Sequence, residues 1–425
     1  MKISNLIGLT ASMIASLLTI ASCADEPAHI SDPTHTKVPA PVKYAAPTTI
    51  EQQFSKQFSL DNIQTIANQV ADYQLSLFDI RSNQMRPEGR ASGIPNGWMY
   101  ATLHIGLEAY AAASGQQEYE QAVINLSQLN QWKPGPRLYH ADDHAVSDVY
   151  LELYEKYGFK YQITPTKKVL DGVLAAQKTN SLVFDNNDKY TEYLDGRKFV
   201  DPSCTYRWCW ADAIFMAPPV WAHMAKISGN NKYLTFMDSE FWATTEYLFD
   251  EKESLFLRDS RYFERRDDEG RKIYWSRGNG WVLAGIARTL RHLPDDFKNK
   301  SKYEFLFTRM SKRLVALQNE SGNWPSSLLD ASDSVARETS GTALIVYAMA
   351  WGVNNGYLDK QTYLPVITKG WDAIVSNVHP SGQVGWVQQV AFAPGSASKN
   401  DSQLYGSGAV LLAAAEITNL LQSSN

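Results

Sequence analysis

One acidic side chain, Asp212, has mostly aromatic and apolar neighbours in the sequence. Residues 201–229 read DPSCTYRWCWADAIFMAPPVWAHMAKISG, and Asp212 stands between Trp210 and Phe215. A lone carboxylate among large apolar side chains is costly to keep charged, so its pKa should rise. A carboxyl group with a raised pKa can donate a proton near neutral pH, which makes Asp212 a candidate general acid. The alternative is an ordinary acid at the start of a helix, where the helix dipole favours it.

A second group of titratable residues reads HADDH, from His140 to His144. Two acids flanked by two histidines suit a metal ion, but we find no further histidine cluster in the sequence to complete the ligand set. An Asp here can also be the N-cap of the following helix. We favour a third interpretation, in which one of these carboxylates acts with Asp212 across a pocket. Paired carboxylates are the usual equipment for cleaving glycosidic bonds.

A third motif, WSRGNGW, spans Trp275 to Trp281. Its glycines allow the backbone to approach a ligand closely. The planar fork of Arg277 suits a carboxylate, and the two tryptophans offer faces for stacking. A phosphate site is disfavoured, because the lysine and the spacing of a P-loop are missing. The motif therefore predicts binding of a polar ligand that can also stack.

Three further segments are weaker candidates. Asn96 and Trp98 stand at the start of another predicted helix, beside a glycine. The segment 337–342, RETSGT, indicates either substrate contact or a helix capped by Ser340 or its neighbour. The segment 384–389, VGWVQQ, is either a pocket rim or ordinary packing.

The composition narrows the class of ligand. The net charge of -5 is mild and no basic block is present, which disfavours a nucleic-acid partner. The 12 Trp and 22 Tyr favour sugar binding, because flat rings with a polar edge match sugar faces. The sequence has no G-x-S-x-G elbow, no cysteine nucleophile motif and no dinucleotide fingerprint. The chemistry is therefore expected to rest on carboxylates and arginines.

The elements that must position these residues are helices. Apolar residues follow helical spacing almost throughout the chain after residue 50, and strand-like alternation is brief, as at 272–275 and 384–390. With no long Pro-rich break, the pattern favours one all-α domain in which six helical hairpins form a ring, an (α/α)6 barrel. An α-solenoid is the alternative, but no fixed repeat supports it. The predicted helices are 60–78, 98–113, 117–130, 144–157, 164–177, 211–227, 232–248, 279–292, 302–318, 340–355, 361–376 and 406–421.

Long polar and aromatic connections separate some of these helices. They run over residues 79–97, 131–143, 178–210, 249–278 and 319–339. Long loops in compact domains are usually functional. The candidate residues gather where these loops meet helix starts.

The N-terminus predicts export. Residues 1–22 have a lysine followed by an apolar run, the layout of a signal peptide. They end in a lipobox-like sequence before Cys23, so we expect lipidation of Cys23, with an unmodified cysteine after a plain signal peptide as the alternative. Residues 23–50 form a Pro-rich linker and residues 51–425 a single catalytic domain. The sequence leaves open whether the remaining pair, Cys204 and Cys209, are core thiols or a disulfide.

Taken together, four segments resemble a known family. They read HADDHAVSDVYLELY, WCWADAIFMAPP, WSRGNGWVLAGIARTL and ETSGTALIVYAMAWGVNNG. They are similar to the unsaturated glucuronyl and rhamnogalacturonyl hydrolases of glycoside hydrolase families 88 and 105, and closer to family 105. The resemblance implies an (α/α)6 barrel that removes a 4,5-unsaturated uronic acid from the non-reducing end of oligosaccharides made by polysaccharide lyases.

The resemblance also implies roles for particular residues. Asp212 matches the general acid/base, and Asp143, the second acid of the ADDH string, matches the other essential carboxylate. No metal or organic cofactor is implied. The residues that match the surroundings of the unsaturated sugar are Trp210, Trp275, Arg277 and Trp281.

One loop departs from the family pattern. Where some members carry a histidine, this chain reads LFLRDSRYFERR, and Arg258 in it is expected to reach a substrate carboxylate or a sulfate. The neighbouring sugar is therefore left open between rhamnose of rhamnogalacturonan and sulfated rhamnose of ulvan. Two further functions stay open, a surface sugar-binding lipoprotein without turnover and a polysaccharide lyase on the same ring of helices. We expect a lipid-anchored protein of the periplasm or cell surface, and the oligomeric state is left open.

Overall fold

The computed structural model describes residues 44–50, 52–79, 84–85, 93–194, 196–330 and 337–423. The chain divides into residues 1–36 and residues 37–425, and all the described residues belong to the second unit. The predicted signal peptide, Cys23 and most of the predicted linker lie outside the described residues.

An inner ring of six helices forms the centre of the described part of the second unit. Each inner helix packs against the next one, and the last packs against the first, so that the ring closes. The inner helices are α2 (Trp98–Ser114), α5 (Ser147–Tyr157), α8 (Pro218–Ser228), α10 (Ser276–Leu290), α12 (Thr339–Asn354) and α14 (Leu404–Gln422).

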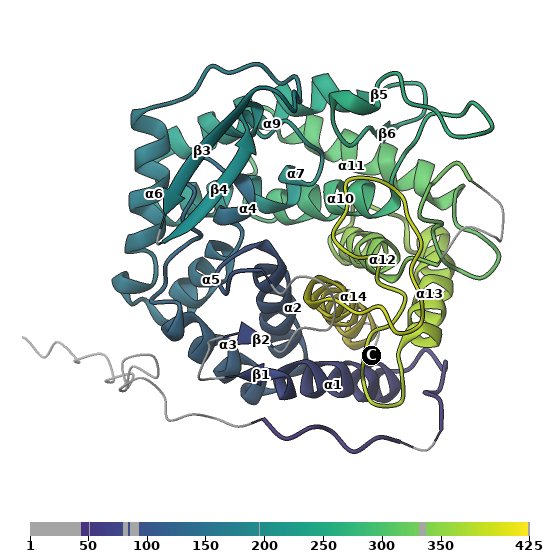
Figure 1. The fold of residues 1–425 in the computed structure, drawn as a ribbon. Coiled ribbons are helices and arrows are strands. Elements are labelled where there is room, and N and C mark those ends of the chain that lie inside the picture. Colours follow the sequence, from purple (N-terminus) through teal and green to yellow (C-terminus); the bar gives the residue numbers. More distant parts are fainter. Residues whose placement is uncertain are drawn as a thin grey trace, which may run out of the picture. The chain divides into compact units, whose positions relative to one another are not determined.

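A second set of helices packs outside this ring. Figure 1 shows α1, α6 and α13 outside, with α2, α12 and α14 inside. Among the described residues this gives six inner and six outer helices, so the predicted (α/α)6 barrel is confirmed. The outer helices are α1 (Leu60–Ser76), α3 (Gln117–Leu129), α6 (Thr164–Ala175), α9 (Asn231–Leu248), α11 (Lys300–Val315) and α13 (Lys360–Asn377).

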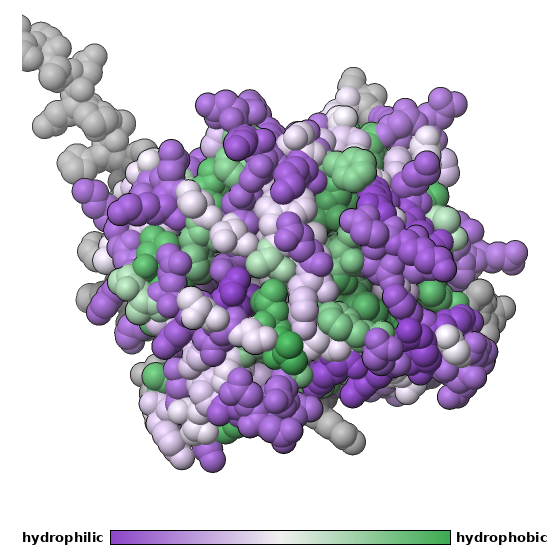
Figure 2. Space-filling model, turned by 90° about the horizontal axis from the view of Figure 1, so that it is seen from above, coloured by the Kyte–Doolittle hydropathy of each residue, from purple (hydrophilic) through white to green (hydrophobic). Residues whose placement is uncertain are grey.

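The inner helices are apolar on most faces because neighbours surround them. Helix α14 is long and apolar enough to cross a membrane, but 83% of its apolar window is buried, as expected for a core helix. Helices α2 and α14 approach closely at Gly106 and Gly408, where an added Cβ would collide with the backbone of the facing helix. Figure 2 shows a mostly hydrophilic face, with hydrophobic residues in separate patches.

Every predicted helix has a counterpart, and two of them are divided. The prediction of one helix over 211–227 was wrong: α7 (Ala213–Met216) ends before Pro218, where α8 begins. Proline at the first helical position is favourable, but its ring disfavours helix in the residue before it. The predicted helix 144–157 is α5, preceded by the single turn α4 (Ala141–His144).

The predicted loop 178–210 contains an antiparallel hairpin that the sequence reading missed. It consists of β3 (Lys189–Leu194) and β4 (Arg197–Pro202), paired from Lys189 opposite Pro202 to Leu194 opposite Arg197. The strand-like segments at 272–275 and 384–390 form only isolated bridges. The remaining short elements are β1 (Phe78–Asp79), β2 (Gln84–Met85), β5 (Phe249–Asp250), β6 (Leu255–Phe256) and the 3-10 helices η1 (Lys160–Gln162), η2 (Ser203–Arg207) and η3 (Ser260–Tyr262).

Candidate active site

Starts of the inner helices and the loops before them surround a narrow pocket of about 80 Å³. Its walls combine two acids, two arginines, four tryptophans and a short apolar segment near residue 391. Most of the residues predicted to do chemistry are brought together here. The lining residues are Trp98, Asp142, Trp210, Asp212, Met216, Arg258, Trp275, Arg277, Trp281, Val390, Ala391 and Phe392.

Asp212 lies directly before α7, and its side chain does not cap that helix. Within the described part of the chain, its buried Oδ2 has no hydrogen-bond partner, and the nearest cation, Arg258, places Nε 3.5 Å away. Burial raises the pKa of Asp212, and the charges of Arg258 and Arg277 oppose part of this rise. The raised pKa that the sequence predicts for Asp212 therefore agrees with its burial beside the tryptophans of the pocket.

Arg258 is held in place by an acid beside it. Its Nη1 donates to Asp259 Oδ2 at 2.7 Å, and Arg261 donates to both oxygens of the same carboxylate. Burial alone would raise the pKa of Asp259, but the hydrogen bonds and charges of the two arginines outweigh it and lower that pKa. The guanidinium of Arg258 also lies 4.9 Å from the ring centroid of Phe392. The Arg258 cation thus stays beside Asp212.

The two acids of the HADDH segment face different surroundings. Asp143 is buried and binds Arg137, which donates from its backbone N–H at 2.7 Å and from Nη2 at 2.6 Å. The other side of the Arg137 guanidinium binds Asp201, with Nη1 3.0 Å from each oxygen. Asp143 does not line the narrow pocket. Asp143 therefore does not share the pocket wall with Asp212, and its role as the second essential carboxylate stays a prediction.

Asp142 takes that place instead. It lines the pocket together with Asp212, and burial raises its pKa to about 7. Arg137 opposes this rise, whereas the charges of Asp143 and Asp212 add to it. The backbone N–H of Asp142 donates to His140 Nδ1, so His140 caps this short helix. The pocket thus holds two carboxyl groups, both with raised pKa values.

Aromatic rings form the rest of the pocket wall. Trp281 meets Trp98 edge to face at 6.2 Å between ring centroids, and Phe215 lies 4.6 Å from Trp281. On its other side, Trp98 lies 4.9 Å from Tyr405. Trp210 packs 4.9 Å from the ring of His140. These contacts fix the orientation of the rings that a flat sugar would meet.

Arg277 lines the pocket, but its hydrogen-bonding groups are largely engaged. Nη1 donates to the carbonyl of Gln388 at 2.7 Å and Nη2 to the carbonyl of Gln389 at 3.0 Å. Glu338 Oε1 lies 3.7 Å from Nη1, and the guanidinium stacks 4.3 Å from Trp275. The expectation of a fork free to grip a carboxylate is therefore corrected. Arg277 contributes positive charge while it holds the segment around Gln388.

The same segment explains two other motifs. Trp275 Nε1 donates to Gln388 Oε1 at 2.9 Å, and Tyr405 donates to the Gln388 carbonyl at 2.6 Å. The carboxylate of Glu338 accepts from Ser340 N and Gly341 N, so Glu338, rather than Ser340, caps α12. The segment 384–389 is therefore held in place by these hydrogen bonds, and the residues that follow it, up to Phe392, line the pocket. Sequence reasoning missed Tyr405 and Phe392, which carry no motif of their own.

Asn96 is placed outside the pocket. Its Nδ2 donates to the carbonyl of Pro134 at 2.8 Å and, more weakly, to that of Lys133 at 3.4 Å. Asn96 does not line the narrow pocket. In the structure Asn96 joins the start of α2 to the loop before α4, and its predicted contact with substrate stays a prediction.

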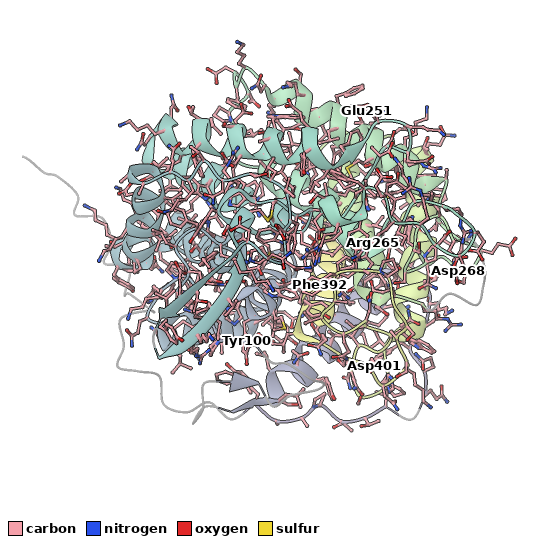
Figure 3. The ribbon with its side chains drawn as sticks, turned by 45° about the horizontal axis from the view of Figure 1, so that its top comes forward. Tyr100, Glu251, Arg265, Asp268, Phe392 and Asp401 are labelled. Carbon is pink, nitrogen blue, oxygen red and sulfur yellow. A yellow bond between two sulfur atoms is a disulfide. The ribbon has the colours of Figure 1, made fainter. Side chains whose placement is uncertain are left out.

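A wider cavity of about 330 Å³ adjoins the narrow pocket. The two share Asp142, Trp210, Arg258 and Phe392. Figure 3 shows Phe392 beside the β3–β4 hairpin, on the side where the cavity lies. The remaining lining residues are Arg137, His140, Phe184, Asn186, Lys189, Val200, Asp201, Pro202, Thr205 and Arg261.

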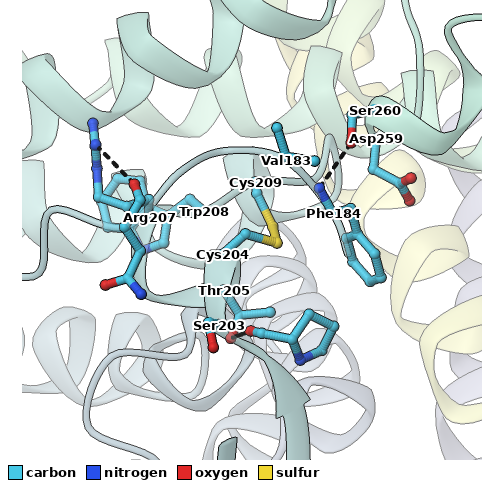
Figure 4. Close-up of a disulfide and its surroundings, with 12 residues drawn as sticks. Val183, Phe184, Ser203, Cys204, Thr205, Arg207, Trp208, Cys209, Asp259 and Ser260 are labelled. Atoms are coloured by element: carbon cyan, nitrogen blue, oxygen red, sulfur yellow. Dashed lines mark hydrogen bonds between the residues drawn. A yellow bond between two sulfur atoms is a disulfide. The ribbon is translucent and has the colours of Figure 1, made fainter. Parts of the chain in front are cut away.

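A disulfide joins Cys204 to Cys209, which settles the pairing that the sequence left open. Figure 4 shows it between the residues around Thr205 and the segment that contains Phe184. In that segment, the backbone N–H of Phe184 donates to Ser260 Oγ at 2.8 Å. The disulfide closes a short loop that ends directly before Trp210, one of the four residues shared by both cavities.

Comparison with known proteins agrees with this arrangement. Residues 66–421 match the model of glycosyl hydrolase family 88. An unsaturated 3S-rhamnoglycuronyl hydrolase of Alteromonas sp. (strain LOR) is 39% identical, covering 85% of this chain and 88% of the relative. A protein of the same name from Formosa agariphila is 36% identical, covering 77% of this chain and 85% of the relative.

Solved structures are also similar. A glycosyl hydrolase family 88 protein from Bacteroides vulgatus has a TM-score of 0.71 and 27% identity, covering 85% of this chain and 99% of that one. A structure described as a polysaccharide lyase, BACCELL_00875, has a TM-score of 0.70 and 28% identity, covering 86% of this chain and 98% of that one. The family match and the two relatives at more than 30% identity show that the chain belongs to glycosyl hydrolase family 88 and is a glycoside hydrolase.

Proposed function

We propose that this enzyme removes a 4,5-unsaturated uronic acid from the non-reducing end of oligosaccharides produced by polysaccharide lyases. The single observation that carries the proposal is the buried carboxyl of Asp212, which has a raised pKa and faces the narrow aromatic pocket. An unsaturated uronate is flattened around its double bond, so it suits tryptophan faces better than a saturated chair does. The arginines beside Asp212 supply positive charge for the uronate carboxylate.

The reaction begins at the enol ether of the sugar ring. Asp212 donates its proton to C4 of the C4=C5 double bond, and positive charge develops at C5 and the ring oxygen. The Asp212 carboxylate then accepts a proton from water, whose oxygen bonds to C5. The resulting hemiketal opens and releases the neighbouring sugar, so one water is consumed for each bond cleaved and Asp212 is protonated again.

Asp142 is the second carboxyl of this mechanism. In its ionised form it stabilises the positive charge that develops on the ring, and in its neutral form it donates a hydrogen bond to the substrate. A pKa of about 7 allows both forms near neutral pH. Because it lines both cavities, Asp142 lies where the bond between the uronate and the next sugar would pass.

For the next sugar we propose sulfated rhamnose. Four cations line the wider cavity, namely Arg137, Lys189, Arg258 and Arg261. Because Arg137 is paired with Asp143 and Asp201, and Arg258 and Arg261 with Asp259, Lys189 of β3 is the cation best suited to a sulfate. The two relatives named unsaturated 3S-rhamnoglycuronyl hydrolases support the same substrate class. Unsulfated rhamnose from rhamnogalacturonan is the alternative, but it has no anionic group that a cation of the cavity could bind.

A lyase of the same fold is the competing activity, since one similar structure is described as a lyase. The two reactions change absorbance in opposite directions, because the hydrolase consumes the conjugated double bond and a lyase creates it. A sugar-binding protein without turnover would change neither. One ultraviolet trace on a defined substrate therefore separates the three.

The test uses oligosaccharides from lyase digests of ulvan and of rhamnogalacturonan, followed by ultraviolet absorbance and mass spectrometry. We expect absorbance to fall, with gain of water and loss of one uronate, and to fall faster on the sulfated ulvan products. A flat trace on both digests, or a rising one on the intact polysaccharides, contradicts the proposal. Faster turnover of the rhamnogalacturonan products would agree with the proposed reaction but contradict the proposal that the neighbouring sugar is sulfated.

We further propose that the protein is exported to the periplasm or cell surface and held there by lipid on Cys23. The Cys204–Cys209 disulfide supports an oxidising compartment. Mass spectrometry of the N-terminal peptide from the membrane fraction should find a diacylated Cys23, and Cys23→Ser should release the protein from that fraction. An N-terminus that still begins at Met1 would contradict both processing and anchoring.

A further inference from the structure

A second cluster of chemically capable side chains lies deeper in the barrel than the candidate active site. Asp148 and Glu152 come from α5, His223 from α8 and His292 from just after α10. Each offers one nitrogen or oxygen atom, and these atoms all lie within 4.8 Å of one another. On α10, Arg288 contacts this cluster and stands 11 residues after Arg277, about 16 Å further along the helix. This cluster is separate from the HADDH segment, and the sequence reading did not identify it.

The two histidines have nitrogens that hydrogen bonding does not satisfy. Their rings stack 3.9 Å apart and are tilted by only 10°. His292 is 3% exposed, and in the part of the chain that the structure describes neither of its ring nitrogens has a hydrogen-bond partner. Its Nε2 is 3.9 Å from Glu152 Oε1, an oxygen that is paired with Arg291 Nη1 at 3.0 Å. Buried polar atoms without partners are rare and call for an explanation.

Carboxyl groups are concentrated around the four residues. Further carboxyls nearby belong to Glu108, Glu155 and Glu416, and the fixed cations belong to Arg288, Arg291 and Lys226. Burial raises the pKa of Glu108 to about 7 and also raises that of Glu416. The site therefore favours either a bound cation or bound protons.

We propose that these four residues bind a divalent metal ion, with zinc as the best fit to the donor set. Two imidazole nitrogens and two carboxylate oxygens are ligands that zinc commonly takes in a tetrahedral site. Arg288 contacts Asp148 Oδ2, so a metal would bind Oδ1, the oxygen that faces His223 Nδ1. That oxygen is 3.3 Å from His223 Nδ1, about the separation of two ligand atoms that each lie roughly 2.0 Å from one tetrahedral zinc.

The site would act on stability rather than on the reaction. A metal held by α5, α8 and the end of α10 joins three inner helices that are far apart in the sequence. The metal would thus join α10, which contains Arg277, to α8, which follows the segment that contains Asp212. Binding needs the wider pairs of ligand atoms to move together by about 1 Å, because zinc bonds are roughly 2.0–2.2 Å long.

The competing explanation is that bound protons supply the positive charge. His223 Nδ1 is 3.3 Å from Asp148 Oδ1 and its Nε2 is 3.2 Å from Glu155 Oε2, so a protonated His223 would bridge the two acids. In that case the cluster needs no metal. The two explanations differ in whether the folded protein binds metal at one ion per chain.

The test measures metal content and cobalt binding on the full mature protein without a histidine tag. After zinc loading and dialysis, we expect about one zinc per chain in the wild type and much less in His292→Gln. The control is His104→Gln, because His104 is also buried with unpartnered ring nitrogens in the described structure but lies outside the four ligands. It should keep its zinc.

The spectrum of wild-type protein loaded with cobalt(II) in place of zinc is a readout that does not depend on the variants folding. The wild type should show intense visible bands of tetrahedral cobalt, and His292→Gln should bind cobalt about tenfold more weakly or worse. A strong chelator should lower the melting temperature of the wild type and leave that of His292→Gln unchanged. Wild-type protein with no stoichiometric metal, no tetrahedral cobalt spectrum and no response to chelator would overturn the proposal in favour of protons.

Discussion

The narrow pocket and the wider cavity beside it are built from different parts of the fold. The narrow pocket rests on the starts of inner helices, where Asp212, Trp98 and Trp281 are packed against other rings. The wider cavity rests on the β3–β4 hairpin and loops, with exposed residues such as Val200 and Phe392 on its border. Rigid elements position reacting groups more accurately than loops do, whereas loops vary more easily. The difference suggests that the first region performs the reaction and the second selects the neighbouring sugar.

The largest effect that would test this division is expected from Asp212→Asn. The amide cannot donate a proton to C4 or accept one from water, so kcat should fall by about 10³-fold or more, near the upper part of the range for general acid–base catalysis. Because an ionisable group buried without a partner is removed, the melting temperature should stay the same or rise. Ultraviolet turnover assays and thermal unfolding on the same sample measure both quantities. Retained turnover in this variant would contradict the proposal that the reaction takes place in the narrow pocket.

The adjacent acids provide the next test, because the same substitution should act differently at each. Asp142→Asn should lower kcat by about 10²-fold, since this side chain faces the pocket. At neutral pH it should keep or raise stability, because it removes a buried carboxyl whose pKa is raised. Asp143→Asn should mainly destabilise the fold, because it leaves the half-buried guanidinium of Arg137 with only Asp201 as a partner. Chemical denaturation and kcat on the two variants separate these effects. The reverse pattern would restore Asp143 as the catalytic partner.

These adjacent acids also show how far sequence reasoning reaches. The HADDH and WCWAD strings identify where the acids are, and their resemblance to a family identifies the chemistry. They do not tell which of two neighbouring acids faces the pocket, since successive residues on a helix point about 100° apart. That choice depends on Arg137, whose only sequence signal is a position six residues before Asp143.

The helices could be predicted from the sequence, whereas the wider cavity could not. Twelve runs of apolar residues at helical spacing have counterparts in the structure, because burial of one face is visible in a sequence. The β3–β4 hairpin buries little, so its residues read as a polar loop. The engagement of Arg277 by two backbone carbonyls depends on a segment more than a hundred residues away, which no local pattern indicates.

The pH dependence of turnover tests the electrostatics of the narrow pocket. Burial raises the pKa of Asp212, so its acid form should persist to higher pH than that of an ordinary Asp and be lost as pH rises through the raised pKa. Turnover should therefore be highest on the acidic side and fall about tenfold per pH unit once the acid form becomes scarce. In Arg258→Ala, the loss of the nearby cation should move this alkaline limb to higher pH. A limb that moves to lower pH would contradict the assigned contact.

The stability of the fold should depend on pH through the titration of Asp142. Its pKa is about 7 in the folded protein and near the ordinary value when unfolded, so the folded state binds the extra proton. Stability from this group is therefore present at low pH and is lost as pH rises from about 4 to about 7. Asp142→Asn should remove that part of the pH dependence. Unfolding curves at several pH values, compared with those of the wild type, measure the change.

The wider cavity is expected to give a smaller and more selective effect. In Lys189→Ala, loss of a cation should raise KM for sulfated oligosaccharides by about tenfold, the effect of one charge-assisted hydrogen bond, and leave kcat nearly unchanged. Lys198→Ala is the matched control, because Lys198 lies on the partner strand of the same hairpin and does not line the cavity. Unsulfated substrate should not distinguish the two variants. Equal effects on both substrates would mean that Lys189 supports the hairpin rather than selecting the sugar.

The smallest effect is expected from Asn96, which lies close to the pocket in sequence but is turned away from it. Asn96→Ala removes a hydrogen bond to the carbonyl of Pro134, which should cost about 1 kcal/mol of unfolding free energy. Trp98, two residues further on, keeps its contacts with Trp281 and Tyr405, so kcat and KM should change less than twofold. Denaturant unfolding and turnover of this variant test whether the start of α2 acts only as support. A marked rise in KM with unchanged stability would instead place Asn96 at the substrate, and would extend the reacting region beyond the narrow pocket.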